Sequence, residues 1–261
     1  MSLPVARLPA DWTPAATSLA GRVILITGAA GGLGRASARA CAQAGATVLL
    51  ADRKTRALEP VYDELAALPG APQPVLQPMD LQGASPLEYQ TFAESVERQL
   101  GRLDGVVHAA AKMEGLTPLS TLSPEAWITT LHVDLSAPFL LTQACLPLLL
   151  AREDSAVVFV LDDPERMGRA HWGAYGVAKA GLEGLASILH EETDEGGLRV
   201  HALLPAPMRT ALRRTVWAGE DPATIPTPET AARAVVYLLS PDAAPARGKL
   251  LDLRQSAAAK G

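Results

Sequence analysis

The chain has 261 residues, of which 48% are apolar and 20% charged, and its formal net charge is −5. This length suits one α/β domain with a substantial core, and the acidic balance without a basic stripe argues against nucleic-acid binding. No run approaches the roughly 20 apolar residues of a membrane span, and the N-terminus lacks a signal-peptide core. The two cysteines, Cys41 and Cys145, lie in apolar segments typical of buried thiols. We therefore expect a cytoplasmic protein.

Short apolar, β-branched runs alternate with longer helical patterns along the chain. Such alternation predicts βαβ units and a parallel sheet that is buried on both faces. The predicted strands are 22–26, 46–51, 74–79, 104–109, 156–161, 198–204 and 248–253. The predicted helices are 33–44, 55–68, 86–100, 123–151, 173–195 and 228–240. The fold class is therefore α/β, with about seven parallel strands and helices on both faces.

The chain contains no repeat and no linker that would divide it into two domains. We expect an irregular N-terminal arm over 1–19, a single domain over 20–254 and a frayed tail over 255–261. The segment 206–227 is rich in Pro, Arg and Trp and follows a predicted strand. In an open parallel sheet, an insertion at a carboxyl end is where a substrate loop lies.

A glycine-rich loop joins the first predicted strand to the first predicted helix. The motif "TGAAGGLG" spans 27–34 and includes Gly28, Gly31, Gly32 and Gly34. Glycines allow a backbone to approach a pyrophosphate closely, and a helix N-terminus offers free N–H groups and partial positive charge. The loop between strand and helix, followed by Asp52 at the end of the next strand, favours dinucleotide binding over a turn that binds nothing.

The residue types after the second and third predicted strands bear on cofactor choice. Asp52 can accept hydrogen bonds from an adenosine ribose and would repel a 2′-phosphate, so NAD is favoured over NADP. The adjacent Arg53 offers the alternative of gripping a 2′-phosphate, and Asp52 can also be a capping acid. Asp80 follows the third strand, where an adenine contact and a simple turn cap are equally plausible.

Tyr175 and Lys179 are four residues apart within a predicted helix. That spacing is one helical turn, so it places a hydroxyl and an ammonium on the same face. The structural alternative is an aromatic residue and a snorkelling lysine on a buried helix.

Taken together, these motifs resemble the short-chain dehydrogenase/reductase family. The shared features are "TGAAGGLG" (27–34), Asp80-Leu81 and "YGVAK" (175–179), and the resemblance covers roughly residues 20–253. It implies a Rossmann-type doubly wound parallel sheet and hydride transfer between nicotinamide and a carbonyl or alcohol. The stretches "LTQACLPLLL", "GRAHWGAY" and "PMRTALR" look most similar to the YciK-type oxidoreductases.

The resemblance also implies roles for individual residues. Tyr175 would be the general acid/base, and Lys179 would lower its pKa and hold the nicotinamide ribose. The implied cofactor-binding residues are Gly28, Gly31, Gly32, Leu33, Gly34, Asp52, Arg53, Asp80, Leu81, Ala109, Tyr175, Lys179 and Thr210. The family commonly pairs through its two long helices, so we expect a homodimer or homotetramer by resemblance alone.

Two catalytic positions depart from the family pattern. The family has a serine 13 residues before the tyrosine that donates a hydrogen bond to the substrate oxygen, and this chain has Asp162 there. An ionised carboxylate donates no hydrogen bond, and losing such a donor typically costs ~3–4 kcal/mol of transition-state stabilisation. A protonated Asp162 would need a raised pKa, which the adjacent Asp163 favours. The family's asparagine that positions the lysine is replaced by Asp134.

No histidine or cysteine cluster has the spacing of a metal site, so we predict no metal. His171 lies close enough to Tyr175 in sequence to flank the pocket, although a proton-relay role is the weaker interpretation. Two hypotheses for the function remain. One is an NAD(P)-dependent oxidoreductase that uses Tyr175, Lys179, Asp162 and Asp134 on an unknown small-molecule substrate. The other is a catalytically impaired dinucleotide-binding protein with a sensing or assembly role.

Overall fold

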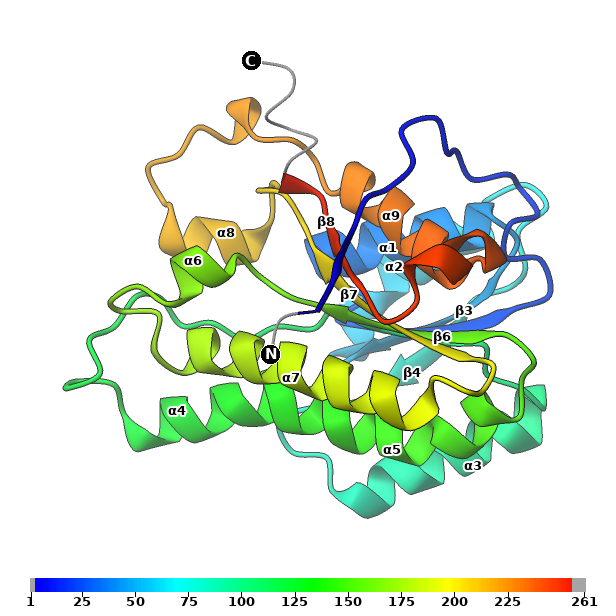
Figure 1. Cartoon of the computed structure of the whole chain (residues 1–261), viewed down its shortest axis with the longest axis horizontal. Coiled ribbons are helices and arrows are strands. Elements are labelled where there is room, and N and C mark those ends of the chain that lie inside the picture. Colours follow the sequence, from blue (N-terminus) through cyan, green and yellow to red (C-terminus); the bar gives the residue numbers. More distant parts are fainter. Residues whose placement is uncertain (1–2, 255–261) are drawn as a thin grey trace.

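The computed structural model describes residues 3–254, which form one parallel β-sheet with helices on both faces (Figure 1). The order across the sheet is β1-β8-β7-β6-β5-β2-β3-β4, and all neighbouring strands are parallel. The strands are β1 (Val5–Ala6), β2 (Val23–Thr27), β3 (Thr47–Asp52), β4 (Val75–Pro78), β5 (Gly105–His108), β6 (Ser155–Val160), β7 (Leu198–Leu204) and β8 (Leu250–Asp252). The order reverses between β2 and β5, and ligands bind at the carboxyl ends of strands beside such a reversal.

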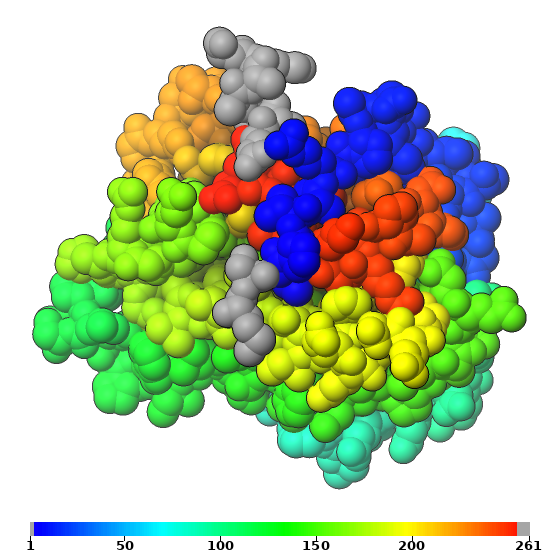
Figure 2. All heavy atoms as spheres, in the orientation of Figure 1, coloured from blue at the N-terminus to red at the C-terminus, as the bar shows by residue number. Residues whose placement is uncertain are grey.

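The seven predicted strands are confirmed, and the sheet has one more. The additional strand β1 lies within residues 1–19 and pairs with β8 through Val5 and Leu250. Because it has two residues and follows a proline, it shows none of the alternation that identifies a strand in sequence. Figure 2 shows this arm crossing the surface beside the C-terminal segment and α7. The backbone N–H of Leu3 donates to Glu183 Oε1 at 3.3 Å.

The helices form two layers (Figure 1). The helices of regular length are α1 (Gly32–Gln43), α2 (Thr55–Ala66), α3 (Pro86–Leu100), α4 (Pro124–Leu131), α5 (Ala137–Leu150), α7 (Gly173–Thr193) and α9 (Glu229–Leu239). The short helices are α6 (Pro164–Met167), α8 (Ala211–Val216), η2 (Pro222–Thr224) and η3 (Pro241–Ala246). One buried apolar cluster joins α1, α2 and α9 to the sheet, and a second joins α3, α5 and α7 to the opposite face.

The predicted helix 123–151 is continuous but changes pitch in its middle. A π-helical segment, η1 (His132–Ser136), separates α4 from α5, and such segments are frequent at functional sites. Ser123 caps the start, and its side chain accepts from Ala126 N at 3.1 Å. The stretch Pro124–Leu150 is long and apolar enough to cross a membrane by length and composition, contrary to our reading of the sequence, and half of the apolar window is buried in the fold. Core helices of soluble proteins pass the same test.

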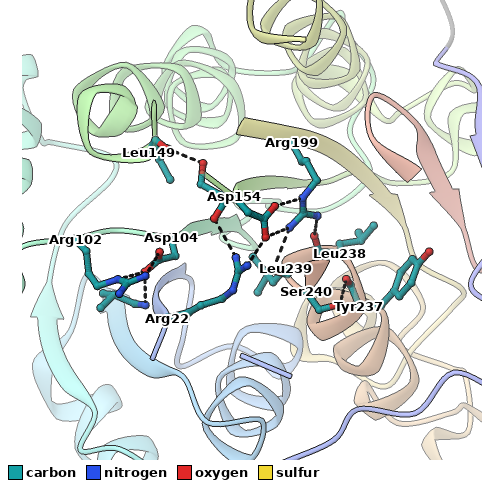
Figure 3. Close-up of polar contacts among 12 residues, drawn as sticks. Arg22, Arg102, Asp104, Leu149, Asp154, Arg199, Tyr237, Leu238, Leu239 and Ser240 are labelled. Atoms are coloured by element: carbon teal, nitrogen blue, oxygen red, sulfur yellow. Dashed lines mark hydrogen bonds and ion pairs between the residues drawn. The ribbon is translucent and has the colours of Figure 1, made fainter. Parts of the chain in front are cut away.

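The amino ends of the central strands are tied by a polar network (Figure 3). Asp154, just before β6, pairs with Arg22 and accepts from Arg199 Nε at 2.6 Å. Burial opposes ionisation of Asp154, but the two guanidinium groups lower its pKa below the ordinary value. Arg199 also donates to Leu238 O at 2.7 Å, near the end of α9, where positive charge is favourable. The network therefore fixes the edge of the sheet opposite the carboxyl ends.

Candidate active site

A cleft of about 620 Å³ lies at the carboxyl edge of the sheet. It brings together residues that are far apart in the chain, from the glycine loop through β6 and α7 to α8. The sequence-predicted site residues that line it are Gly28, Gly31, Gly32, Leu33, Gly34, Asp52, Arg53, Asp80, Leu81, Ala109, Asp162, Tyr175, Lys179 and Thr210. Of the predicted catalytic residues, Asp134 is not part of the lining and lies buried behind it.

The glycine loop forms the floor of the cleft because the backbones pack closely there. A Cβ at Gly28, which has φ +66°, would lie 2.7 Å from Ala110 Cα. A Cβ at Gly34 would lie 2.0 Å from Gly28 O, so only glycine fits this crossing. Helix α1 begins at Gly32 without a side-chain cap, and its first N–H groups are therefore free to bind a phosphate. This cradle fits the pyrophosphate of a dinucleotide.

Two acids mark the adjacent strand ends. The Asp52 carboxylate accepts from Ala30 N at 3.2 Å and from Arg53 N at 2.8 Å, so it is held over the glycine loop. Asp80 accepts from Gln82 N at 3.1 Å and also lines the cleft. Asp80 therefore caps a turn, which is one of its two possible roles, and it remains exposed on the cleft where a ligand could contact it.

Tyr175 and Lys179 lie one turn apart on α7, and each is only 5% exposed. Lys179 Nζ donates to Val160 O at 2.9 Å and lies 5.5 Å from the centre of the Tyr175 ring. The helix therefore presents the phenol and the ammonium group to the same cleft as the glycine loop.

Asp162 is the hydrogen-bond partner of Tyr175. The phenol Oη donates to Asp162 Oδ2 at 3.0 Å, Asp163 N donates to Oδ1 at 2.7 Å, and Arg166 Nη2 forms an ion pair with Oδ1. Three donors therefore converge on this group, and both of its oxygens serve as hydrogen-bond acceptors. The side chain of the adjacent Asp163 has a partner of its own, because its Oδ1 accepts from Arg254 Nη1 at 2.7 Å.

The surroundings of Tyr175 oppose its ionisation. Burial first, and then the negative charges of Asp162 and Asp134, raise the pKa of Tyr175 well above its ordinary value, although Arg166 counteracts them. A phenolate beside two carboxylates would also lose its hydrogen bond to Asp162. The resemblance implied a lowered pKa at this tyrosine, whereas here the phenol is held protonated.

Asp134 lies in the π-helical segment and is 1% exposed. Its Oδ1 accepts from Lys112 N at 2.7 Å, while Oδ2 is buried and has no hydrogen-bond partner among residues 3–254. Burial raises the pKa of Asp134 to about 7, against the lowering effect of Lys179 and Lys112. Near neutral pH this group is therefore balanced between an acceptor-only carboxylate and a carboxylic acid that can donate.

An aromatic and basic wall closes the substrate side of the cleft. Trp172 and Trp217 lie 5.7 Å apart, between ring centres, and pack with Met113, Leu212 and Val216. Arg213 Cζ lies 4.5 Å from the Trp217 ring centre, and its guanidinium bonds Glu220 through Nε at 2.6 Å. Trp217 comes from the segment 206–227, as expected of a pocket-shaping loop.

The family model for short chain dehydrogenase matches residues 22–221 of the chain. The chain belongs to this family. It is therefore an oxidoreductase with a nicotinamide dinucleotide site. It is 35% identical over 231 residues to the uncharacterized oxidoreductase YciK of Escherichia coli K12, covering 88% of this chain and 91% of that protein.

Solved structures agree over nearly the whole length. The YciK oxidoreductase from E. coli is 34% identical, with a TM-score of 0.87, and covers 93% of this chain and 98% of its own. A short chain dehydrogenase from E. coli CFT073 complexed with NADPH is 35% identical, with a TM-score of 0.87, and covers 92% and 99% respectively. The fold and the nucleotide site are thus shared with proteins of this family.

Sequence reasoning missed Arg166 and Trp172 as residues of the site. Arg166 lies four residues after Asp162 on the short helix α6, which no periodicity revealed because it is four residues long. His171, by contrast, is exposed and is not part of the cleft lining. In the described part of the chain, no three His, Cys, Asp or Glu side chains group as metal ligands.

Asp134→Asn should stabilise the protein at about pH 8 by roughly 1–3 kcal/mol and have little effect near pH 4. In the unfolded chain the carboxyl titrates near its ordinary 3.8, whereas the folded value is about 7. Between these values the folded state binds more protons, so the stability of the wild type falls as pH rises through this window. Urea unfolding of both proteins across this range measures the difference, with exposed Asp63→Asn as the control. An Asp134→Asn effect that is the same at both ends of the range would contradict this assignment.

Proposed function

We propose that the chain transfers hydride between a nicotinamide dinucleotide and a carbonyl or alcohol substrate, with Tyr175 as the proton donor and acceptor. One observation carries the proposal: Tyr175, Lys179 and the glycine loop line a single cleft. The backbone crossing at Gly28 and the uncapped start of α1 fit a pyrophosphate at one end. Tyr175 lies at the other end, where the reacting carbon would be placed.

The protonation state of Tyr175 favours carbonyl reduction over alcohol oxidation. When bound, the reduced nicotinamide supplies the hydride to the carbonyl carbon. Tyr175 Oη then gives its proton to the carbonyl oxygen, and solvent protons must restore the phenol. A protonated phenol is ready for this step, whereas oxidation requires it to start as a phenolate, which burial and Asp162 oppose.

Lys179 and Asp162 have different roles in this reaction: Lys179 acts on Tyr175, and Asp162 acts on the substrate. The ammonium group of Lys179, at 5.5 Å from the ring centre, stabilises negative charge that forms on Tyr175. The Asp162 carboxylate accepts hydrogen bonds, so it suits a substrate with a hydroxyl or ammonium group beside the reacting carbon. The substrate class that follows is a hydroxyl-rich or cationic carbonyl compound.

A catalytically impaired dinucleotide-binding protein is the second candidate, and the Tyr175–Asp162 hydrogen bond favours it. The proton that catalysis requires is engaged with a carboxylate at 3.0 Å. The cofactor half of the cleft would then serve sensing or assembly, and no carbonyl compound would be reduced.

Asp162→Ser should raise the rate of carbonyl reduction by ~10²-fold or more, because it removes a negative charge and adds a hydroxyl donor at the substrate oxygen. The pH profile of kcat should also shift toward lower pH, because the pKa of Tyr175 loses one of the charges that raise it. Initial rates over a panel of aldehydes, ketones and diketones measure both effects.

Glu165→Ser, which changes an exposed acid three residues away on α6, is the matched control and should leave the rates unchanged. An Asp162→Ser variant that folds, binds cofactor and still reduces nothing in the panel would reject Asp162 as the cause of low activity.

We propose NAD as the preferred cofactor, because the Asp52 carboxylate is fixed by two backbone N–H groups where an adenosine ribose would lie. Calorimetry should show tighter binding of NADH than of NADPH. Asp52→Asn should move the ratio of the two dissociation constants roughly tenfold toward NADPH, since it removes charge repulsion of a 2′-phosphate.

Asp63→Asn should not move this ratio, because Asp63 is exposed on α2 outside the cleft. The relative from E. coli CFT073 is complexed with NADPH. If the wild type binds NADPH more tightly than NADH, the attraction of Arg53 for a 2′-phosphate outweighs the repulsion by Asp52, and the proposed preference for NAD is wrong.

A further inference from the structure

The substrate end of the cleft needs a hydrogen-bond donor that Asp162 cannot supply. Negative charge develops on the carbonyl oxygen during reduction, and a fixed donor at that oxygen lowers the barrier. Tyr175 provides one donor, and an ionised Asp162 provides none. Arg166, four residues after Asp162 and ion-paired with it, brings further donors to this point.

Arg166 is held at the reacting end by contacts on several sides. Its Nη2 forms an ion pair with Asp162 Oδ1, while Tyr175 Oη donates to Oδ2 of the same carboxylate. The guanidinium carbon lies 5.7 Å from the centre of the Trp172 ring and 5.0 Å from that of Trp217. Because the phenol and the guanidinium bind the two oxygens of one carboxyl group, both lie at the same end of the cleft.

Arg166 also keeps donors that nothing in the described chain uses. Nε is buried and has no acceptor within residues 3–254, and the only hydrogen bond of the guanidinium there is made by Nη2. Nε is enclosed by protein atoms, whereas Nη1 makes no hydrogen bond to the described residues and Arg166 lines the cleft, so Nη1 is the donor left for a ligand such as a carbonyl oxygen.

The neighbouring Arg213 shows the contrast. It also faces Trp217, but both Nε and Nη2 are bonded to the Glu220 carboxylate, at 2.6 and 2.7 Å. This bidentate pair satisfies the planar fork of the guanidinium. Arg213 therefore supports the wall of the cleft, whereas Arg166 has donors left for a ligand.

The helix that carries Arg166 is anchored at both ends. The Asp163 side chain caps α6 by accepting from Glu165 N at 3.2 Å, and Asp163 is in turn bonded by Arg254. Met167 is buried at the other end of α6, in a cluster with Trp172 and Tyr175. Arg166 is thus positioned by the fold rather than by its ion pair alone.

We propose that Arg166 is a catalytic residue that donates a hydrogen bond to the substrate carbonyl oxygen, in place of the serine of the family. The role rests on the proposed function. The oxygen receives its proton from Tyr175, while Arg166 stabilises the developing charge and keeps its own protons, because a guanidinium does not deprotonate in proteins. Within the proposed class of hydroxyl-bearing or cationic carbonyl compounds, the favoured substrates are those whose flat or apolar part fits against Trp172 and Trp217.

A simpler role for Arg166 would be to neutralise Asp162, and a double-mutant cycle separates the two. The proteins are the wild type, Asp162→Ala, Arg166→Met and the double variant. Alanine removes the carboxylate without adding a donor. The assay follows reduction of 9,10-phenanthrenequinone, a flat aromatic diketone, at saturating NADH or NADPH, and calorimetry measures cofactor binding by each protein.

If Arg166 is the donor, Arg166→Met should lower kcat by ~10²–10³-fold with cofactor affinity unchanged. Asp162→Ala should remain active, and the double variant should lose a similar factor in kcat relative to Asp162→Ala. Arg166→Lys, which keeps the charge but not the planar fork, should be intermediate, and the exposed Arg169→Met should match the wild type.

A double variant as active as Asp162→Ala would overturn the proposal, because Arg166 would then matter only as the counter-ion of Asp162. Loss of cofactor binding in Arg166→Met and Arg166→Lys alike would also overturn it, in favour of a structural role. A wild type that binds cofactor but reduces neither the diketone nor any compound of the aldehyde and ketone panel, with Asp162→Ala equally inert, would reject the proposed function itself, and this inference with it.

Discussion

The chemistry of this cleft depends on the hydrogen bond from Tyr175 Oη to Asp162. This hydrogen bond joins the phenol that we propose as the proton donor to the carboxyl group of Asp162, inside a site where both groups are largely removed from water. Because burial and the carboxylates oppose formation of phenolate, the tyrosine stays protonated. In the mechanism that we propose, the direction of proton transfer and the need for another donor both follow from this one contact.

The fold places this contact opposite the cofactor cradle. Strands β2 and β6 end at the same edge of the parallel sheet, so the glycine loop and Asp162 face one cleft. The close packing of Gly28 on Ala110 forms its floor, and α7 carries Tyr175 and Lys179 across it. At the far edge, the Asp154–Arg199 network fixes the strands that carry these groups. The sheet and its long helices thus hold the glycine loop, while the short helices α6 and α8 complete the substrate side of the cleft.

Most of the fold was predictable because its elements have strong local signals. Seven strands, the six helical segments and the glycine loop are each marked by periodicity, glycines or capping residues such as Ser123. Strand β1 was not predictable, since two residues show no alternation and their pairing with β8 is a contact over the length of the chain. The last long helix, predicted over 228–240, begins at Glu229 without a side-chain cap.

The composition of the site was partly predictable, and its electrostatics were not. Motifs identified Tyr175, Lys179 and the glycines, and the family spacing identified Asp162 and Asp134 as departures. Sequence could not show that three donors, Tyr175 Oη, Asp163 N and Arg166 Nη2, converge on Asp162. Nor could it show that Asp134 is buried with one free oxygen. Both properties arise from contacts between elements that only the folded chain brings together.

The most direct test of the central claim is an ultraviolet titration of tyrosine ionisation in the wild type and in Tyr175→Phe. The difference between the two curves isolates the phenol of Tyr175 from the other three tyrosines. We expect no ionisation attributable to Tyr175 below about pH 10, the ordinary pKa of tyrosine. A phenol that ionises near neutral pH in the wild type and is missing from the variant would contradict it, because Lys179 would then outweigh burial and Asp162.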